Sequence, residues 1–159
     1  MKILLAFFIF IQFSFSNDYP CHKVAEKELE PFTFTYLLMT IYNASYYKTK
    51  NLEQINISYL RNLATKYTRQ GWESGLKNNI KDEKTFLKVF NWIESINKDA
   101  LNGDCFQFVK NRNDVRFYIN GKLEALAKSK DIMDSIFLPW LGEKPMSDSM
   151  KAHLLGNIK

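Results

Sequence analysis

The amino-acid sequence predicts an α+β protein, an antiparallel sheet with a layer of helices over one face. Two observations support this fold class. Strand-like and helix-like patterns are segregated along the chain instead of alternating, which argues against βαβ units. The 159 residues fit one domain, and no internal repeat or linker divides them.

The first strands are predicted from composition and from alternation. Residues 32–47 are rich in aromatic and β-branched side chains, which is typical of strands, and we expect a turn near Asn43-Ala44. Residues 52–59 alternate between apolar and polar side chains from Ile55 onward, which indicates a half-buried strand.

Helical spacing of apolar residues follows. We expect a first helix from Leu60 to Leu76, in which Gly71 and Gly75 each lower stability by about 1 kcal/mol relative to alanine. Asp82 is suited to cap a second helix. The expected buried stripe of that second helix is Phe86, Val89, Phe90, Ile93 and Ile96.

A second group of strands then returns. Residues 105–110 and 115–119 have strand composition, and residues 122–127 supply the returning strand of a hairpin. Asn120-Gly121 between the last two segments is a strong signal for a two-residue hairpin turn.

The C-terminal segments are expected to form two short helices that cover sheet surface left bare by the middle pair. Ser129 and Ser147 are the expected N-caps, and Gly142 is suited to a left-handed C-terminal cap. Pro139 interrupts the first of these helices, and a kink is favoured over a new short turn. Trp140 is expected to be buried, which makes this stretch structural.

Residues 1–16 have the pattern of a secretory signal peptide, with Lys2 before an apolar run and Ser14-Phe15-Ser16 before the expected cleavage point. The apolar run, residues 3–13, is shorter than the roughly 20 residues that span a bilayer, although a retained anchor is the alternative. We therefore expect a mature domain of residues 17–159, periplasmic or secreted, with no stable membrane anchor after processing.

Two cysteines, Cys21 and Cys105, predict one disulfide in an exported chain. Free thiols, or a metal site that includes His22, are the alternatives. Because the spacing of cysteines and histidines is irregular, we expect no metal and no cofactor.

The formal net charge of +5 is scattered along the chain, which indicates solvated surface. Nucleic acid is not expected as a partner, and binding to acidic lipid or polysaccharide stays open.

Five segments in this order resemble the chalcone isomerase-like family, in particular its small exported bacterial branch. They are "IYNASYY", "INISYLRNL", "GWESGL", "FYINGKLEAL" and "IFLPWLGEKPMSDSMKAHLLG", and the likeness covers roughly residues 30–156. The resemblance implies a curved antiparallel sheet backed by helices, with a cleft between them. In the plant enzymes this cleft holds a chalcone, and related members without the reaction bind fatty acids there.

The resemblance also implies which groups catalysis needs: an arginine on an early strand, a threonine on a strand, and a tyrosine and an asparagine on the first helix. Residues 30–47 contain no arginine, and matching the strand tyrosine to Tyr42 places Leu38 at the threonine position. Tyr67 lies two residues later than the plant spacing. We therefore name no catalytic residue.

The leading functional prediction is non-catalytic binding of a small lipophilic ligand, such as a fatty acid or an aromatic acid. The candidate binding residues are Arg61, Tyr67, Tyr42 and Trp72. Arg61 suits a carboxylate because a guanidinium binds it bidentately, and the aromatic residues suit an apolar body, although each residue also has an ordinary packing interpretation. An isomerase acting on a chalcone-like or other enone substrate, and an envelope partner-binding protein with a filled core, are the alternatives.

Overall fold

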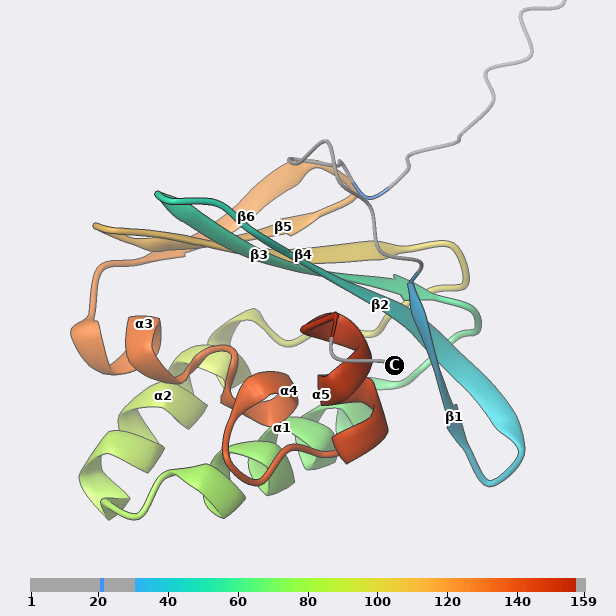
Figure 1. The fold of residues 1–159 in the computed structure, drawn as a ribbon, viewed down its shortest axis with the longest axis horizontal. Coiled ribbons are helices and arrows are strands. Elements are labelled where there is room, and N and C mark those ends of the chain that lie inside the picture. The colour runs from blue at the N-terminus through green and yellow to red at the C-terminus, as the bar shows by residue number, and fades with distance from the viewer. Residues whose placement is uncertain (1–20, 22–30, 157–159) are drawn as a thin grey trace, which may run out of the picture.

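The structure, a computed structural model, describes Cys21 and residues 31–156. Its centre is a six-stranded antiparallel sheet in which each strand pairs with its neighbours in the sequence, and the helices lie against one face (Figure 1). The predicted α+β class is confirmed. The elements are β1 (Phe32–Tyr36), β2 (Met39–Lys48), β3 (Leu52–Tyr59), α1 (Thr65–Asn79), α2 (Glu83–Ile96), β4 (Cys105–Asn111), β5 (Val115–Ile119), β6 (Lys122–Ala127), α3 (Lys130–Ser135), α4 (Leu138–Leu141) and α5 (Asp148–Leu154).

The predicted turn at Asn43-Ala44 is wrong, because both residues lie inside β2 and pair with β3. The chain instead turns at Leu37-Leu38, where the backbone has φ of 47° and 65°. Leucine rarely adopts this left-handed conformation, so the residues of the turn give no signal in the sequence that the chain turns there.

The predicted strand over residues 52–59 is confirmed as β3, but both of its faces are buried in the middle. Ile55 and Ile57 face the helices and belong to the core. On the other face, Gln54 donates from Nε2 to Asn56 Oδ1 at 2.6 Å, and Gln107 of β4 donates to the same oxygen at 3.1 Å. Side-chain amides therefore hydrogen-bond across the strands on the face away from the helices.

The first helix begins at Thr65 and not at Leu60. Leu60 still continues the sheet, since its N–H donates to the carbonyl of Ile41 at 3.0 Å. The helix starts where Asp99 accepts hydrogen bonds from both N–H and Oγ1 of Thr65. This long-range contact overrides the apolar spacing that predicted an earlier start.

The second helix agrees with its prediction. Asp82 occupies the N-cap and accepts from the N–H of Thr85 at 2.7 Å. The apolar stripe faces the sheet, and its buried members are Val89, Phe90, Ile93 and Ile96.

The predicted kink at Pro139 is wrong. The helix ends at Ser135, and a new short helix, α4, starts at Leu138 with Pro139 in its first turn. Proline is tolerated there because the first N–H groups of a helix have no intrahelical acceptor. Trp140 is buried, as predicted.

The capping predictions near the C-terminus have mixed outcomes. Ser147 caps α5, whereas Ser129 occupies the N-cap of α3 without a side-chain hydrogen bond to it. Gly142 is extended (φ −65°, ψ 179°), so the predicted left-handed cap is wrong. The lack of a side chain matters for another reason: a Cβ at Gly142 would lie 2.4 Å from Oδ1 of Asn79.

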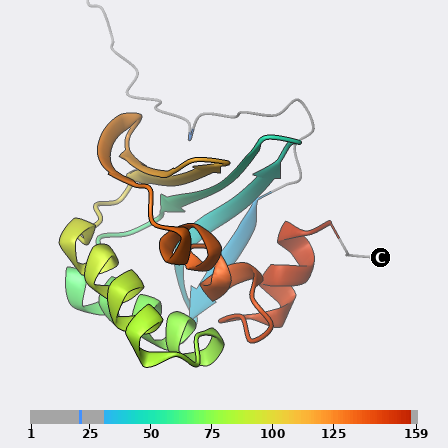
Figure 2. The same cartoon turned by 90° about the vertical axis from the view of Figure 1, so that its left-hand side faces the viewer.

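Among the C-terminal helices, α5 covers the part of the sheet that α1 and α2 leave bare. Helix α5 contacts β1 and β2, α4 contacts α1, and α3 contacts α2. Figure 2 shows the sheet curving over this helix layer. No helix in the described part of the chain is long and apolar enough to cross a membrane.

Cys21 and Cys105 form a disulfide with their Cα atoms 5.5 Å apart, which confirms the predicted pairing. The bond joins Cys21, which precedes β1 in the sequence, to the first residue of β4. The predicted signal peptide, residues 1–16, and the expected mature start lie outside the described residues. Within residues 21 and 31–156, no group of three metal-ligating side chains is assembled.

Candidate functional site

The interior between the middle strands and the two long helices is the candidate site, which we call the aromatic chamber. Strands β3, β4 and β5 form its floor, α1 and α2 form its roof, and most of its surface is aromatic or aliphatic. Its lining residues are Ile57, Tyr59, Thr68, Trp72, Ile93, Ile96, Asn97, Phe106, Phe108 and Phe117.

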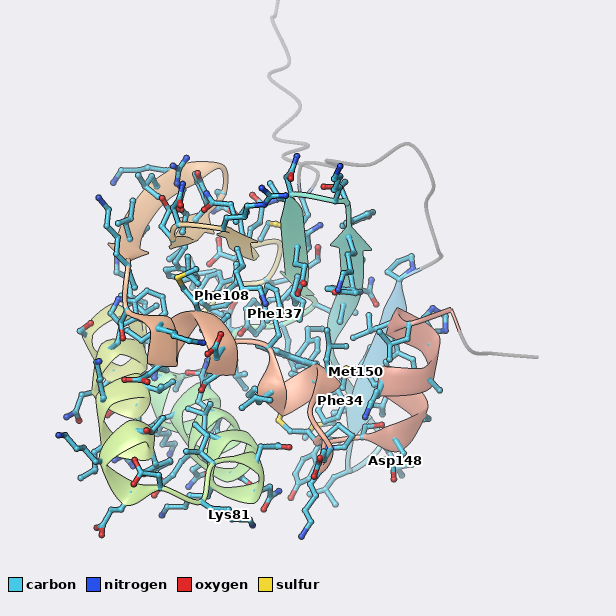
Figure 3. All side chains as sticks on the ribbon, turned by 60° about the vertical axis from the view of Figure 1, so that its left-hand side comes forward. Phe34, Lys81, Phe108, Phe137, Asp148 and Met150 are labelled. Carbon is cyan, nitrogen blue, oxygen red and sulfur yellow. A yellow bond between two sulfur atoms is a disulfide. The ribbon has the colours of Figure 1, made fainter. Side chains whose placement is uncertain are left out.

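Aromatic rings fill most of the chamber. Trp72 of α1 contacts Phe108 edge-to-face, with ring centroids 5.2 Å apart, and contacts Trp140 of α4 at 4.9 Å. Tyr59 contacts Phe106 at 5.0 Å. Figure 3 shows side chains from both layers filling the space around Phe108 and Phe137. The remaining cavity has a volume of about 10 Å³, which holds no more than about one water molecule.

Two polar residues of the chamber, Thr68 and Asn97, lie together at one end, and neither is charged. Thr68 Oγ1 lies 2.8 Å from Asn97 Oδ1, and Asn97 Nδ2 donates to the carbonyl of Thr65 at 3.3 Å. No ionisable cation or carboxylate is among the lining residues. Because a lone buried charge is strongly disfavoured, an anionic group of a ligand belongs at the edge of the chamber.

Two buried tyrosines stay neutral at physiological pH. Burial raises the pKa of Tyr42 to about 12. The nearby indole of Trp140 lowers the same pKa by a smaller amount. The indole N–H falls outside hydrogen-bond geometry. Burial also raises the pKa of Tyr59 above its ordinary range. Their ring centroids are 6.1 Å apart. Neutral phenols can donate a hydrogen bond, but they are poor bases here.

The structure brings two of the four predicted binding residues into the interior. Tyr42 is buried against Tyr59, and Trp72 lines the chamber itself. Tyr67 lies outside, with 53% of its surface exposed and its ring 4.8 Å from Nζ of Lys66. Arg61 lies half-buried in the connection between β3 and α1. Ligand binding by all four residues stays a prediction.

Sequence reasoning missed the polar end of the chamber. Thr68 lies four residues before Trp72, so helical spacing could have placed both on one face of α1. Asn97 carried no such signal, because it is the C-cap of α2 and only the packing of the two helices brings it to Thr68.

The position that the resemblance assigns to a threonine lies away from the chamber. Leu38 is in the β1–β2 turn with 99% of its surface exposed. Since the chamber lining also holds no arginine, lysine or histidine, the lining residues offer no cation to a phenolate or an enone oxygen.

An antiparallel meander interrupted by two helices, with further short helices closing one face, defines a helix-backed curved-sheet protein. The chain belongs to the chalcone isomerase-like family, whose model matches residues 35–156. No curated protein matches the sequence. Among solved structures, a fatty-acid binding protein of Arabidopsis thaliana superposes with a TM-score of 0.57 at 13% identity, covering 81% of this chain and 84% of that one. At this identity the likeness shows the fold.

Proposed function

We propose that this protein binds a small lipophilic carboxylate, such as a fatty acid or an aromatic acid, without catalysing a reaction. The observation that carries the proposal is the aromatic chamber between sheet and helices of a chalcone isomerase-like fold. Apolar interiors with a few convergent polar groups are the usual sites for such ligands. The fatty-acid binding protein that shares the fold supports this choice of ligand class.

The carboxylate is placed at the edge of the chamber, because the lining holds no charged group. Arg61 follows Tyr59 by two residues and leads from the chamber floor toward α1. Its guanidinium can bind a carboxylate through two parallel hydrogen bonds. Tyr67, in the first turn of α1, adds a phenol donor at the same end.

The tail needs space that the packed rings now occupy. Trp72 is the side chain best suited to move, because it is half-buried and lies between Phe108 and Trp140 on the helix side of the chamber. Rotating the indole outward would connect the interior to the outside. Binding is therefore expected to change the fluorescence of Trp72.

The experiment is calorimetric titration of the delipidated protein with oleate and with an aromatic acid. Arg61→Gln is expected to weaken oleate binding about tenfold, by loss of the charge-assisted pair. Arg112→Gln, at the opposite end of the sheet, is the matched control and is expected to bind as the wild type does. The Trp72→Leu variant, which has a larger chamber, is expected to have a higher association rate for oleate.

Two outcomes contradict the proposal. Cyclisation of a hydroxychalcone well above the buffer rate would establish an isomerase instead. Failure of the whole acid panel would favour the second candidate, a partner-binding protein with a filled core, which the cavity of about 10 Å³ specifically favours.

We also propose that the chain is exported and processed near Asn17. The apolar run of residues 3–13 and the Cys21–Cys105 disulfide support this, since disulfides persist in oxidising compartments. N-terminal sequencing of the product is the test, and a membrane-bound protein that retains Met1 contradicts it.

A further inference from the structure

An open hollow lies at the end of the sheet where β2 turns into β3 and β4 turns into β5 (Figure 1). It has a volume of about 320 Å³, and we call it the cationic hollow. Its charged lining residues are Lys48, Lys50, Glu53, Lys110 and Arg112. Four of these are basic and one is acidic, so the lining has a net charge of +3 at pH 7.

The register of the sheet places three of these charges side by side. Lys48 of β2 pairs with Glu53 of β3, and Glu53 pairs with Lys110 of β4. The Nζ atoms of Lys48 and Lys110 each lie 3.1 Å from a different oxygen of the Glu53 carboxylate. Nζ of Lys110 also lies 5.2 Å from the ring centroid of Phe137. Because an ammonium has three N–H donors, both lysines are held in place and still have donors for another anion.

The other two cations, Lys50 and Arg112, lie in the two turns and have no counter-ion. Neither makes an ion pair with any residue that the structure describes. Asp114 is the acidic residue of the β4–β5 connection, but its carboxylate accepts hydrogen bonds from Asn111 and Arg116 instead. An anion from solution can therefore bind both cations without displacing a carboxylate.

Hydrogen bonds fix the backbone of both turns. In the β2–β3 turn the N–H of Thr49 donates to the carbonyl of Leu52 at 2.8 Å. In the β4–β5 turn Oδ1 of Asn111 accepts from the N–H groups of Asn113 and Asp114 at 2.7 Å and 2.9 Å. The backbone that carries the two unpaired cations is thus ordered before an anion binds, which lowers the entropic cost of binding.

We propose that the cationic hollow binds an anion that carries two linked phosphate groups. A net charge of +3 favours a multiply charged anion over a single carboxylate, and guanidinium and ammonium groups are the usual partners of phosphate oxygens. The volume is that of about ten water molecules in the liquid, which exceeds the size of one phosphate group and admits two. None of the described lining residues is aromatic, so this site is distinct from the aromatic chamber.

The test is calorimetric titration at low ionic strength, without divalent cations, using three probes: inorganic pyrophosphate, a nucleoside diphosphate and inorganic phosphate. Pyrophosphate is expected to bind at one site, at least about tenfold more tightly than phosphate, because it engages cations of both turns. A nucleoside diphosphate that binds more tightly than pyrophosphate identifies the diphosphate of a larger molecule as the ligand. Weaker binding of the nucleoside diphosphate identifies the free ion.

Two double variants separate a built site from general attraction to a basic protein. Lys50→Gln with Arg112→Gln removes both unpaired cations and is expected to weaken pyrophosphate binding at least about tenfold. Lys66→Gln with Lys81→Gln removes the same charge from α1 and the α1–α2 connection, and is expected to keep the wild-type affinity within about twofold. Both variants are expected to melt as the wild type does, because none of the four side chains makes an ion pair with a described residue.

Three results overturn the proposal: a wild type that does not bind pyrophosphate, pyrophosphate that binds no more tightly than phosphate, and equal losses in the two double variants. The single variant Arg112→Gln separates this site from the aromatic chamber. It is expected to weaken pyrophosphate binding and to leave oleate binding unchanged. A wild type that binds pyrophosphate but no acid of the panel would contradict the proposed function and leave the cationic hollow as a site.

Discussion

Trp140 shows how a single side chain joins the layers. It is 3% exposed and lies 4.9 Å from Trp72 and 6.4 Å from Phe108, between ring centroids. Trp140→Ala is expected to lower the free energy of unfolding by about 3–5 kcal/mol, through lost burial and the cavity left behind. Urea unfolding followed by circular dichroism measures this. Tyr67→Ala, an exposed aromatic truncation, should change stability by no more than about 0.5 kcal/mol, and equal losses in both variants would contradict the assigned packing.

Tyr42 and Tyr59 predict how stability depends on alkaline pH. The pKa of Tyr42 rises from its ordinary value of 10.0 to about 12 on burial, and burial also raises that of Tyr59. Between pH 10 and 12 the unfolded chain then loses phenol protons that the folded chain keeps, so stability falls as pH rises through this window. Urea midpoints measured across this range should fall less steeply for Tyr42→Phe. A wild type and a Tyr42→Phe variant with the same slope would show that Tyr42 titrates normally.

At the scale of elements, the crossing of α1 and α4 depends on a missing side chain. A Cβ at Gly75 would lie 2.6 Å from the Cβ of Pro139, whereas at Gly71 the nearest atom is Sδ of Met146 at 4.0 Å. Gly75→Ala is therefore expected to destabilise the protein by about 1–3 kcal/mol through overpacking. Gly71→Ala should stabilise it by up to about 1 kcal/mol, because alanine favours the helix. Thermal unfolding of the pair checks the prediction, and two shifts of the same sign would contradict it.

The pattern of the sequence predicts elements better than it predicts their ends. Helical spacing identifies α2, because this helix buries one face against the core. Alternation identifies β3, because its apolar residues face the helices and its polar residues face the other side, although the sequence does not show that this other side is also buried. The β1–β2 turn escapes prediction because its leucines contradict local preference, and the start of α1 escapes because Asp99, distant in sequence, sets it. Composition also fails to predict that Tyr36 and Leu38 are exposed, because large apolar and aromatic residues are expected in the core.

The residues of the candidate site could likewise be predicted only in part from the sequence. Tyr42 and Trp72 could be chosen from the sequence, since large aromatic residues on a strand and a helix face point to the interior. The end at which polar groups meet could not be chosen, because Thr68 and Asn97 belong to different helices. Pairing across helices depends on tertiary packing, which no local pattern contains.

At the scale of the whole molecule, the Cys21–Cys105 disulfide closes a long loop, because the two cysteines are 84 residues apart in the sequence. The double substitution Cys21→Ser with Cys105→Ser is expected to lower stability by about 4–5 kcal/mol on the chain-entropy model. Urea unfolding of the variant, and of the wild type with and without dithiothreitol, provides the measurement. A reduced wild type as stable as the oxidised one would mean that the bond constrains the unfolded chain little.

The position of α4 and α5 after all six strands affects the order in which the core can be completed. During synthesis all six strands emerge before α4 and α5, and each strand after β1 can pair with the strand made before it. Phe137, Trp140, Met150 and Leu154, all buried, emerge only afterwards. Until then the part of the sheet that α5 covers stays open, so a nascent chain stays incompletely folded until its last helices leave the ribosome.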